Sequence, residues 1–289
     1  MTKINVKTFG AIEAGGTKFV CGIGSGPDNL KTIQIPTTLP DETIGAAIDF
    51  FRGQGVTAIG IASFGPVDLN RTSASYGYIT STPKDGWRQT RFAGAVSDAL
   101  AIPVGFDTDT NAAALAESLW GAARDVSSCL YLTVGTGIGG GAIVDGQILH
   151  GRMHPEMGHI RIPHDSAADP FPGSCPFHGD CLEGLASGPA MKRRWGSPAG
   201  ELAADHPAWG LEARYLALAI ANFVFTLSPG RVILGGGVMQ QPHLFEMIRS
   251  ELASIVNSYI DIPDVVPPGL GTRSGVLGAL ALARKAYTE

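Results

Sequence analysis

Short apolar runs interrupted by glycine are the most regular pattern in the chain. Residues 9–24 contain two such runs on either side of Gly15 and Gly16, as expected for a strand, a tight turn and a second strand. Residues 130–147 repeat the arrangement around a longer glycine run at 135–141. Because the two units lie about 120 residues apart, we predict two lobes of similar topology.

Helical periodicity alternates with short apolar strands along the rest of the chain. This alternation predicts α/β lobes. A loop-rich stretch at 150–184 interrupts it, and long irregular segments in compact proteins usually carry function. The predicted helices are 41–54, 90–100, 111–120, 212–227, 243–258 and 274–287, and further strands are predicted at 58–62, 104–107 and 231–234.

At 289 residues the chain is longer than a single hydrophobic core usually grows, which also favours two lobes. We expect residues 1–111, completed by a C-terminal helix at about 274–289, to form the N-terminal α/β lobe. Residues 112–273 would form the second lobe, with a zinc-bearing loop at 150–184.

The charge balance argues against a nucleic-acid partner. The formal net charge is −5, and the densest basic stretch is only Lys192, Arg193 and Arg194. The N-terminal segment lacks a signal-peptide pattern, and no continuous apolar run reaches the roughly 18 residues of a membrane helix. We therefore expect a cytoplasmic protein without a membrane partner.

Many of the 39 glycines cluster in three short runs, which suggests backbone that closely approaches a ligand. Glycine-rich turns offer backbone N–H groups to phosphate. A single glycine hairpin can be no more than a tight turn, but three runs favour a nucleotide. None is a Walker A loop or a dinucleotide fingerprint. The candidate nucleotide-binding residues are Gly15, Gly16, Thr17, Lys18, Thr133, Gly135, Thr136, Gly137, Gly139, Gly235, Gly236 and Gly237.

A short acidic motif lies where a predicted strand ends and an alanine-rich helix begins, at residues 107–111. A carboxylate at the carboxyl end of such a strand can accept the proton of an attacking hydroxyl, and Asp109 is our candidate. The alternative is a helix N-cap, in which Asp109 or Thr110 only satisfies backbone N–H groups.

Four side chains in the loop-rich stretch have the spacing of a tetrahedral zinc site. They are His159, Cys175, His178 and Cys181, and less favoured substitutes are His154, His164 and Asp180. Four protein ligands leave no open position, so such a metal would fix the loop and would not activate water.

Two carboxylates flank these ligands. Glu156 precedes His159 by three residues and Glu183 follows Cys181 by two, so a bound metal would hold both near one place, where carboxylates suit sugar hydroxyls. Cys21 and Cys129 lie in apolar strands and are predicted core residues, whereas Trp87 is a candidate for the mouth of a site.

These motifs occur in the order found in the ROK family (repressors, open reading frames, sugar kinases), which the chain resembles over nearly its whole length. The resemblance implies an actin/hexokinase-like (ribonuclease H-like) fold with a cleft between two α/β lobes. It also implies ATP with magnesium, phosphoryl transfer to a hexose, and a homodimer. By the same resemblance Asp109 is the catalytic base. The implied sugar-binding residues are Gly65, Thr108, Asn111, Glu156, His159 and Glu183.

Two departures from the common family pattern narrow the expected substrate. The family zinc motif usually has a third cysteine where this chain has His178, and residues 176–184 and 81–87 look like the bacterial fructokinase branch. Thr108 replaces an asparagine found in many members, which puts glucose recognition in doubt. We therefore expect D-fructose. The alternatives are a glucokinase, a mannokinase, an N-acetylhexosamine kinase, or a sugar-responsive regulator without its DNA-binding domain.

Overall fold

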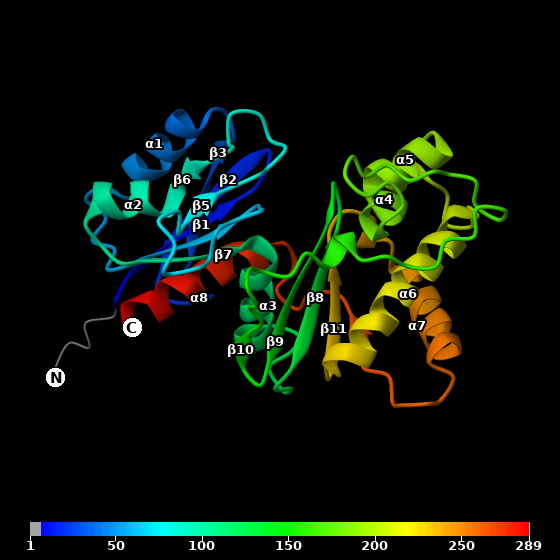
Figure 1. Ribbon diagram of the computed structural model, residues 1–289. Coiled ribbons are helices and arrows are strands. Elements are labelled where there is room, and N and C mark those ends of the chain that lie inside the picture. Colours follow the sequence, from blue (N-terminus) through cyan, green and yellow to red (C-terminus); the bar gives the residue numbers. More distant parts are fainter. Residues whose placement is uncertain (1–6, 289) are drawn as a thin grey trace. The chain divides into compact units, whose positions relative to one another are not determined.

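The computed structural model describes residues 7–288, which form two compact units (Figure 1). Unit 1 consists of Met1–Gly121, Ile148–His154 and Thr272–Glu289. Unit 2 consists of Ala122–Gln147 and Pro155–Gly271. The helix at the C-terminal end of the chain is therefore part of unit 1.

Unit 1 is built on a five-stranded sheet in the order β3-β2-β1-β4-β7. The first two strands form the predicted hairpin across the turn at Gly15 and Gly16, and β1, β4 and β7 run parallel. The strands are β1 (Phe9–Ala14), β2 (Lys18–Gly24), β3 (Lys31–Pro36), β4 (Ile59–Ser63) and β7 (Val104–Thr108).

Two pairs of helices cover this sheet (Figure 1). The isoleucines of β4 pack into a core with helices α1 (Pro40–Phe51) and α2 (Phe92–Leu100). Side chains alternate along a strand, so Gly60 faces the other way, where α8 (Ser274–Thr288) lies. A β-carbon at Gly60 would overlap the carbonyl oxygen of Ala279 in α8. Helix α3 (Asp109–Trp120) packs in turn against α8.

Unit 2 repeats the same sheet plan, in the order β10-β9-β8-β11-β12. Its first two strands form an antiparallel hairpin around the glycine turn, and β8, β11 and β12 run parallel. The prediction of two lobes with similar topology is thereby confirmed. The strands are β8 (Cys129–Val134), β9 (Ile138–Val144), β10 (Gln147–Ile148), β11 (Arg231–Gly235) and β12 (Asp264–Val266).

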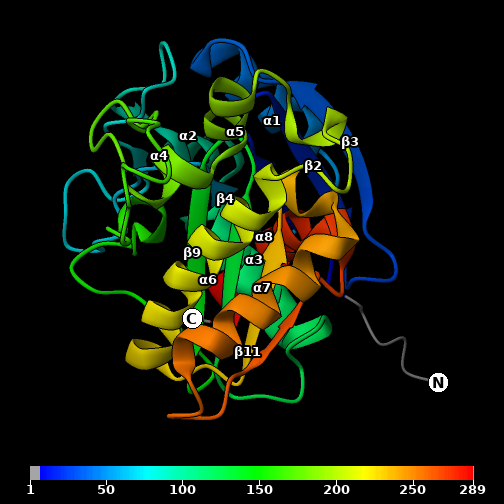
Figure 2. The same cartoon turned by 90° about the vertical axis from the view of Figure 1, so that its right-hand side faces the viewer.

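Helices α6 (Ala208–Leu227) and α7 (Pro242–Val256) lie side by side and cover one face of the unit 2 sheet (Figure 2). Over an 18-residue window α6 has a mean hydropathy of 1.3 and is long enough to cross a membrane. The sequence of α6 is not a continuous apolar run of that length, because Glu212 and Arg214 interrupt it. Since 56% of the window is buried inside the protein, α6 has the character of a core helix.

The remaining elements are short, and some replace predicted irregular or helical structure. The helix predicted from residue 90 begins at Phe92, because β6 (Thr90–Arg91) pairs with β5 (Tyr78–Ile79). Helix α4 (Leu182–Ala186) begins within the last residues of the loop-rich stretch, and α5 (Gly188–Trp195) follows it. The single-turn helices are η1 (Met157–His159), η2 (Ala199–Glu201), η3 (Val238–Gln240) and η4 (Gly271–Arg273).

The predictions for three isolated side chains differ in outcome. Cys21 and Cys129 are buried in β2 and β8, as expected. The idea that Trp87 lines a mouth is wrong, since its side chain is completely buried against Phe19 and Phe92. Its indole N–H donates to a backbone carbonyl oxygen at 2.8 Å, so the residue belongs to the core of unit 1.

Candidate active site and metal cluster

In unit 1 the carboxyl ends of β1, β4 and β7 lie next to one another. Ala14 pairs with Ser63, and Ser63 pairs with Thr108. The segments that follow these strands therefore start at one edge of the sheet, where parallel α/β sheets commonly bind ligands. These segments contain the turn at Gly15, the Gly65–Pro66 peptide, which is cis, and Asp109.

Asp109 is the first residue of α3 and is half-buried. Its carboxylate accepts the Thr110 N–H at 2.8 Å. The helix N-cap is Thr108, whose hydroxyl oxygen accepts the Asn111 N–H at 3.1 Å. The alternative reading that Asp109 or Thr110 is the cap is therefore wrong, and Asp109 lies at the positive end of the helix.

Asn111 is completely buried, and its amide group donates to Asp107 Oδ1 at 2.8 Å. The other carboxylate oxygen of Asp107 lies 2.8 Å from His150 Nε2. These contacts fix the junction between β7 and α3, directly beside Asp109. Sequence reasoning gave no role to Asp107 or His150, because 43 residues separate the two and only the fold brings them together.

Glu13, to which sequence reasoning gave no role, is a second carboxyl group near Asp109. Burial and, to a smaller extent, the negative charge of Asp109 together raise the pKa of Glu13 to about 7, against the opposing effect of Lys18. The backbone N–H of Val276, in the first turn of α8, hydrogen-bonds the carboxyl group. The sequence signal that could have identified Glu13 is its position directly before Ala14 and the glycine turn at Gly15.

The turn after β1 is tight. The Gly15 N–H donates to the Lys18 carbonyl oxygen at 3.0 Å, and Thr37 Oγ1 donates to the Gly15 carbonyl oxygen at 2.8 Å. A β-carbon at Gly15 would lie only 2.8 Å from that Lys18 oxygen, so a side chain does not fit here. Gly16, Thr17 and Lys18 are exposed and accessible to a ligand.

The Gly65–Pro66 segment is held by His154. Its Nε2 accepts the Val67 N–H at 3.1 Å, and its side chain is buried. His154, which sequence analysis gave as a less favoured metal ligand, is thus bonded to the Val67 backbone and is not part of the metal cluster. Gly65 itself is half-buried.

In unit 2 the second and third glycine runs lie at one edge of the sheet. Strands β8 and β11 are parallel, and Thr133 pairs with Gly235. Gly236 has a φ of 94°, and a β-carbon there would overlap the Val134 carbonyl oxygen. Glycine is thus required for this close approach. Thr133 also pairs with Gly139 of β9, so the predicted residues of both runs gather here.

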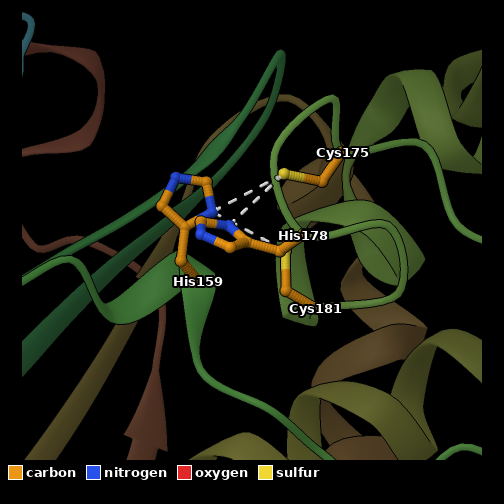
Figure 3. Close-up of side chains that lie close together, drawn as sticks. All are labelled: His159, Cys175, His178 and Cys181. Atoms are coloured by element: carbon orange, nitrogen blue, oxygen red, sulfur yellow. Dashed lines mark hydrogen bonds between the residues drawn. The ribbon is translucent and has the colours of Figure 1, made fainter. Parts of the chain in front are cut away.

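The predicted metal ligands also gather in unit 2 (Figure 3). Their ligand atoms all lie within 4.8 Å of one another. Cys181 Sγ lies 3.6 Å from His159 Nδ1, and Cys175 Sγ lies 3.9 Å from the same nitrogen and 3.7 Å from His178 Nδ1. Around a tetrahedral zinc, neighbouring sulfur and nitrogen ligands are about 3.3–3.8 Å apart. The four residues therefore fit a zinc ion.

The backbone also prepares this cluster. His159 ends η1, and Cys175 and Gly179 exchange backbone hydrogen bonds of 3.2 and 3.0 Å, which close the loop that carries His178. The substitutes His164 and Asp180 face each other at 3.4 Å outside the set. Since His159 Nδ1 faces the sulfur atoms, its Nε2 can donate to a group outside the cluster.

The two candidate sugar-binding glutamates occupy different environments. Glu156 is exposed, and its carbonyl oxygen accepts the His159 N–H at 3.0 Å. Glu183 is half-buried in α4, and its Oε2 accepts the Ile138 N–H at 2.9 Å. Glu183 thus contacts the glycine turn of the second run, which its sequence position gave no reason to expect.

A buried ion pair behind the loop was also missed. The Asp169 carboxylate accepts hydrogen bonds from Arg194 Nε at 3.1 Å and from the Tyr215 hydroxyl at 2.6 Å. Arg194 also donates to the Leu185 carbonyl oxygen at 2.8 Å. These contacts tie the loop to α5 and α6. Arg194 and Tyr215 lie 25 and 46 residues after Asp169, so no local sequence pattern predicts these contacts.

Comparison with known proteins agrees with this architecture. Residues 9–286 match the ROK family. A Bacillus subtilis protein named provisionally as a fructokinase is 50% identical over 287 residues, covering 96% of each chain. A Pediococcus pentosaceus fructokinase is 45% identical, covering 96% of this chain and 98% of its own. The crystal structure of a ROK hexokinase from Thermus thermophilus has a TM-score of 0.82 at 29% identity, covering 96% of this chain and 98% of its own. The chain thus has the actin/hexokinase-like fold and belongs to the ROK family.

Proposed function

We propose that the protein transfers the γ-phosphate of ATP to D-fructose and forms fructose 6-phosphate. The observation that carries this proposal is the similarity to proteins named fructokinase, which are 41–50% identical over nearly their whole length. Proteins named glucokinase are 27–31% identical to the chain. Fructose is therefore a better-supported substrate than glucose.

Unit 1 would supply the general base. Asp109 is half-buried at the carboxyl end of β7, at the same edge of the sheet as the turn that follows β1, and its carboxylate would accept the proton of the attacking sugar hydroxyl. The exposed backbone of Gly16, Thr17 and Lys18 would contact phosphate oxygens of the magnesium–ATP substrate. Gly65, Thr108 and Asn111 would shape the sugar site from the same edge.

Unit 2 would supply most of the nucleotide contacts. The runs at 135–137 and 235–237 present closely approaching backbone at the carboxyl ends of two parallel strands. Thr133, Thr136 and Gly139 belong to the same edge. On the neighbouring loop, the carboxylates of Glu156 and Glu183 and the Nε2 of His159 would bind sugar hydroxyls.

The cysteine–histidine cluster would hold one zinc ion through His159, Cys175, His178 and Cys181. A zinc ion with four protein ligands stabilises a loop and leaves no position for substrate. His159 would then link the metal to the sugar, since Nδ1 faces the cluster and Nε2 is fixed as a donor. We further expect a homodimer in the cytoplasm, without a nucleic-acid or membrane partner.

A hexose panel tests the proposed activity. ADP release with ATP and magnesium is measured against D-fructose, D-glucose, D-mannose and N-acetylglucosamine, and the product is identified by its phosphorylated carbon. We expect fructose to give the highest kcat/KM. A kcat/KM for glucose about tenfold above that for fructose would contradict the choice of substrate.

Glu156→Gln tests the sugar site separately. The substitution keeps the size of the side chain but removes a charge-assisted hydrogen bond, so the KM for fructose should rise about 10- to 100-fold. The KM for ATP should change little. The same substitution at the exposed Glu201 is the matched control. An increase confined to the KM for ATP would contradict the assignment of Glu156 to the sugar.

A further inference from the structure

The segment that follows the last metal ligand holds both ends of the glycine turn after β8. At one end the Gly188 N–H donates to the Gly135 carbonyl oxygen at 2.8 Å. At the other end the Ile138 N–H donates to Glu183 Oε2 at 2.9 Å. Glu183 comes two residues after Cys181, and Gly188 begins α5. The turn is thus fixed by residues 181–188.

The segment that carries the first metal ligand packs against the same hairpin. A β-carbon at Gly158, next to His159, would overlap the Ile138 carbonyl oxygen. One at Gly140 would lie 2.5 Å from the sulfur atom of Met157. Helix η1 therefore packs closely against β9, and only glycine permits this approach.

The two ligand-bearing segments are also joined to each other. The Leu182 N–H donates to the Ile160 carbonyl oxygen at 3.0 Å, one residue beyond Cys181 and His159 respectively. Metal bonds from these two residues would hold the segments in this register. Loss of the metal would leave the register to a few hydrogen bonds, and Glu183 would lose its fixed position beside Ile138.

We propose that Glu183 is a positioning residue for the glycine turn at 135–138, and that metal binding at the cluster raises the affinity of this turn for the phosphates of a nucleotide. The proposal rests on the nucleotide-binding role assigned to the turn above. It gives the metal cluster an effect on the nucleotide as well as on the sugar. Because one hydrogen bond is at stake, its loss should weaken nucleotide binding about 2- to 10-fold.

Two substitutions separate the positioning role of Glu183 from its sugar contact. Glu183→Ala removes the acceptor, whereas Glu183→Gln keeps an amide oxygen that can accept the Ile138 N–H. Both should raise the KM for fructose. Only the alanine variant should loosen the turn, so glutamine rescues one effect and not the other. Exposed Glu201→Ala in the same unit is the control.

The coupling itself is measured by amide hydrogen exchange of a peptide covering residues 135–141, without any nucleotide. Exchange should be faster in the Glu183→Ala variant and in chelator-treated wild-type protein, and unchanged in Glu183→Gln and Glu201→Ala. Peptides from α6 report whether the unit remains folded. Equal exchange in zinc-loaded wild type and zinc-loaded Glu183→Ala would overturn the positioning role, whatever chelation does.

Calorimetric titration with the non-hydrolysable analogue AMP-PNP and magnesium tests the second part of the proposal, the effect of Glu183 and of the metal on nucleotide affinity. The Kd should rise about 2- to 10-fold in Glu183→Ala and in the zinc-depleted protein, and stay within about twofold in Glu183→Gln. An unchanged Kd would overturn this half of the proposal. If wild type failed to bind AMP-PNP at all, the proposed kinase activity would fail with it, while the exchange measurement would still decide the coupling.

Discussion

Asp109 lies at the start of a helix and has a buried carboxyl group, that of Glu13, as a neighbour. Because Asp109→Asn keeps the shape of the side chain and removes its ability to accept a proton, kcat should fall about 10²- to 10⁴-fold. Fructose binding, measured by calorimetry, should stay nearly intact. The control is Asp98→Asn, at an exposed residue of α2 in the same unit. More than half of the wild-type kcat in Asp109→Asn would remove the residue from the role of base.

Glu13 predicts an unusual pH dependence of stability. Burial and the charge of Asp109 raise its pKa to about 7 in the folded protein, so folding takes up a proton between the ordinary glutamate pKa and that value. The associated stability is complete below the ordinary pKa and is lost as the pH rises through about 7. A shift of this size corresponds to about 3 kcal/mol.

Urea unfolding of wild type and Glu13→Gln at a series of pH values, without magnesium or nucleotide, measures this effect. The neutral glutamine cannot titrate, so the variant should gain stability relative to wild type as the pH rises from about 4.5 to 7.5. Glu42→Gln, at an exposed residue at the start of α1, should follow wild type. A constant difference between wild type and Glu13→Gln over this range would show that Glu13 titrates normally.

At the scale of elements, the loop from η1 to α4 has little regular structure and depends on its side-chain contacts. Freshly purified protein, prepared without chelator, should contain one zinc ion per chain by elemental analysis. Cys181→Ser should lower both the zinc content and the free energy of unfolding, the latter by several kcal/mol, because a closed zinc site contributes folding energy directly.

Cys129→Ala provides the control for this element. Cys129 is also buried in unit 2, but it lies in β8 outside the cluster, so the substitution should cost packing energy and leave the zinc content unchanged. Zinc-free wild-type protein with full thermal stability would contradict a structural metal in the loop. The buried contacts of Asp169 with Arg194 and Tyr215 fasten a different part of the same loop.

At the scale of the whole molecule, elements with strong local patterns could be predicted from the sequence. The two glycine hairpins and the long helices have regular periodicity, and the four metal ligands have characteristic spacing. Strand β3 was not predicted because it is exposed along nearly its whole length and only two isoleucines, Ile33 and Ile35, mark its apolar face. Strand β12 has only three residues and is defined by its pairing with β11.

The site was predictable only where its residues are close in sequence. Asp109 and the glycine runs could be named because each directly follows a strand. Two contacts of the site join residues that are far apart in the sequence: His150 with Asp107, 43 residues apart, and Glu183 with Ile138, 45 residues apart. Both contacts form only when the tertiary structure brings the residues together. The proton affinity of Glu13 likewise arises from burial by distant residues, which no local pattern records.

The position of α8 has a consequence for the synthesis of the protein. This helix completes unit 1 by packing on β1, β4, β7 and α3. Roughly 150 further residues must be translated after Gly121 before the ribosome reaches Thr272 and the helix that follows it. At about 5–20 residues per second, that interval lasts about 8–30 s. The lobe that is translated first is therefore finished last, and in each nascent chain one apolar face of its sheet is open to chaperones throughout that time.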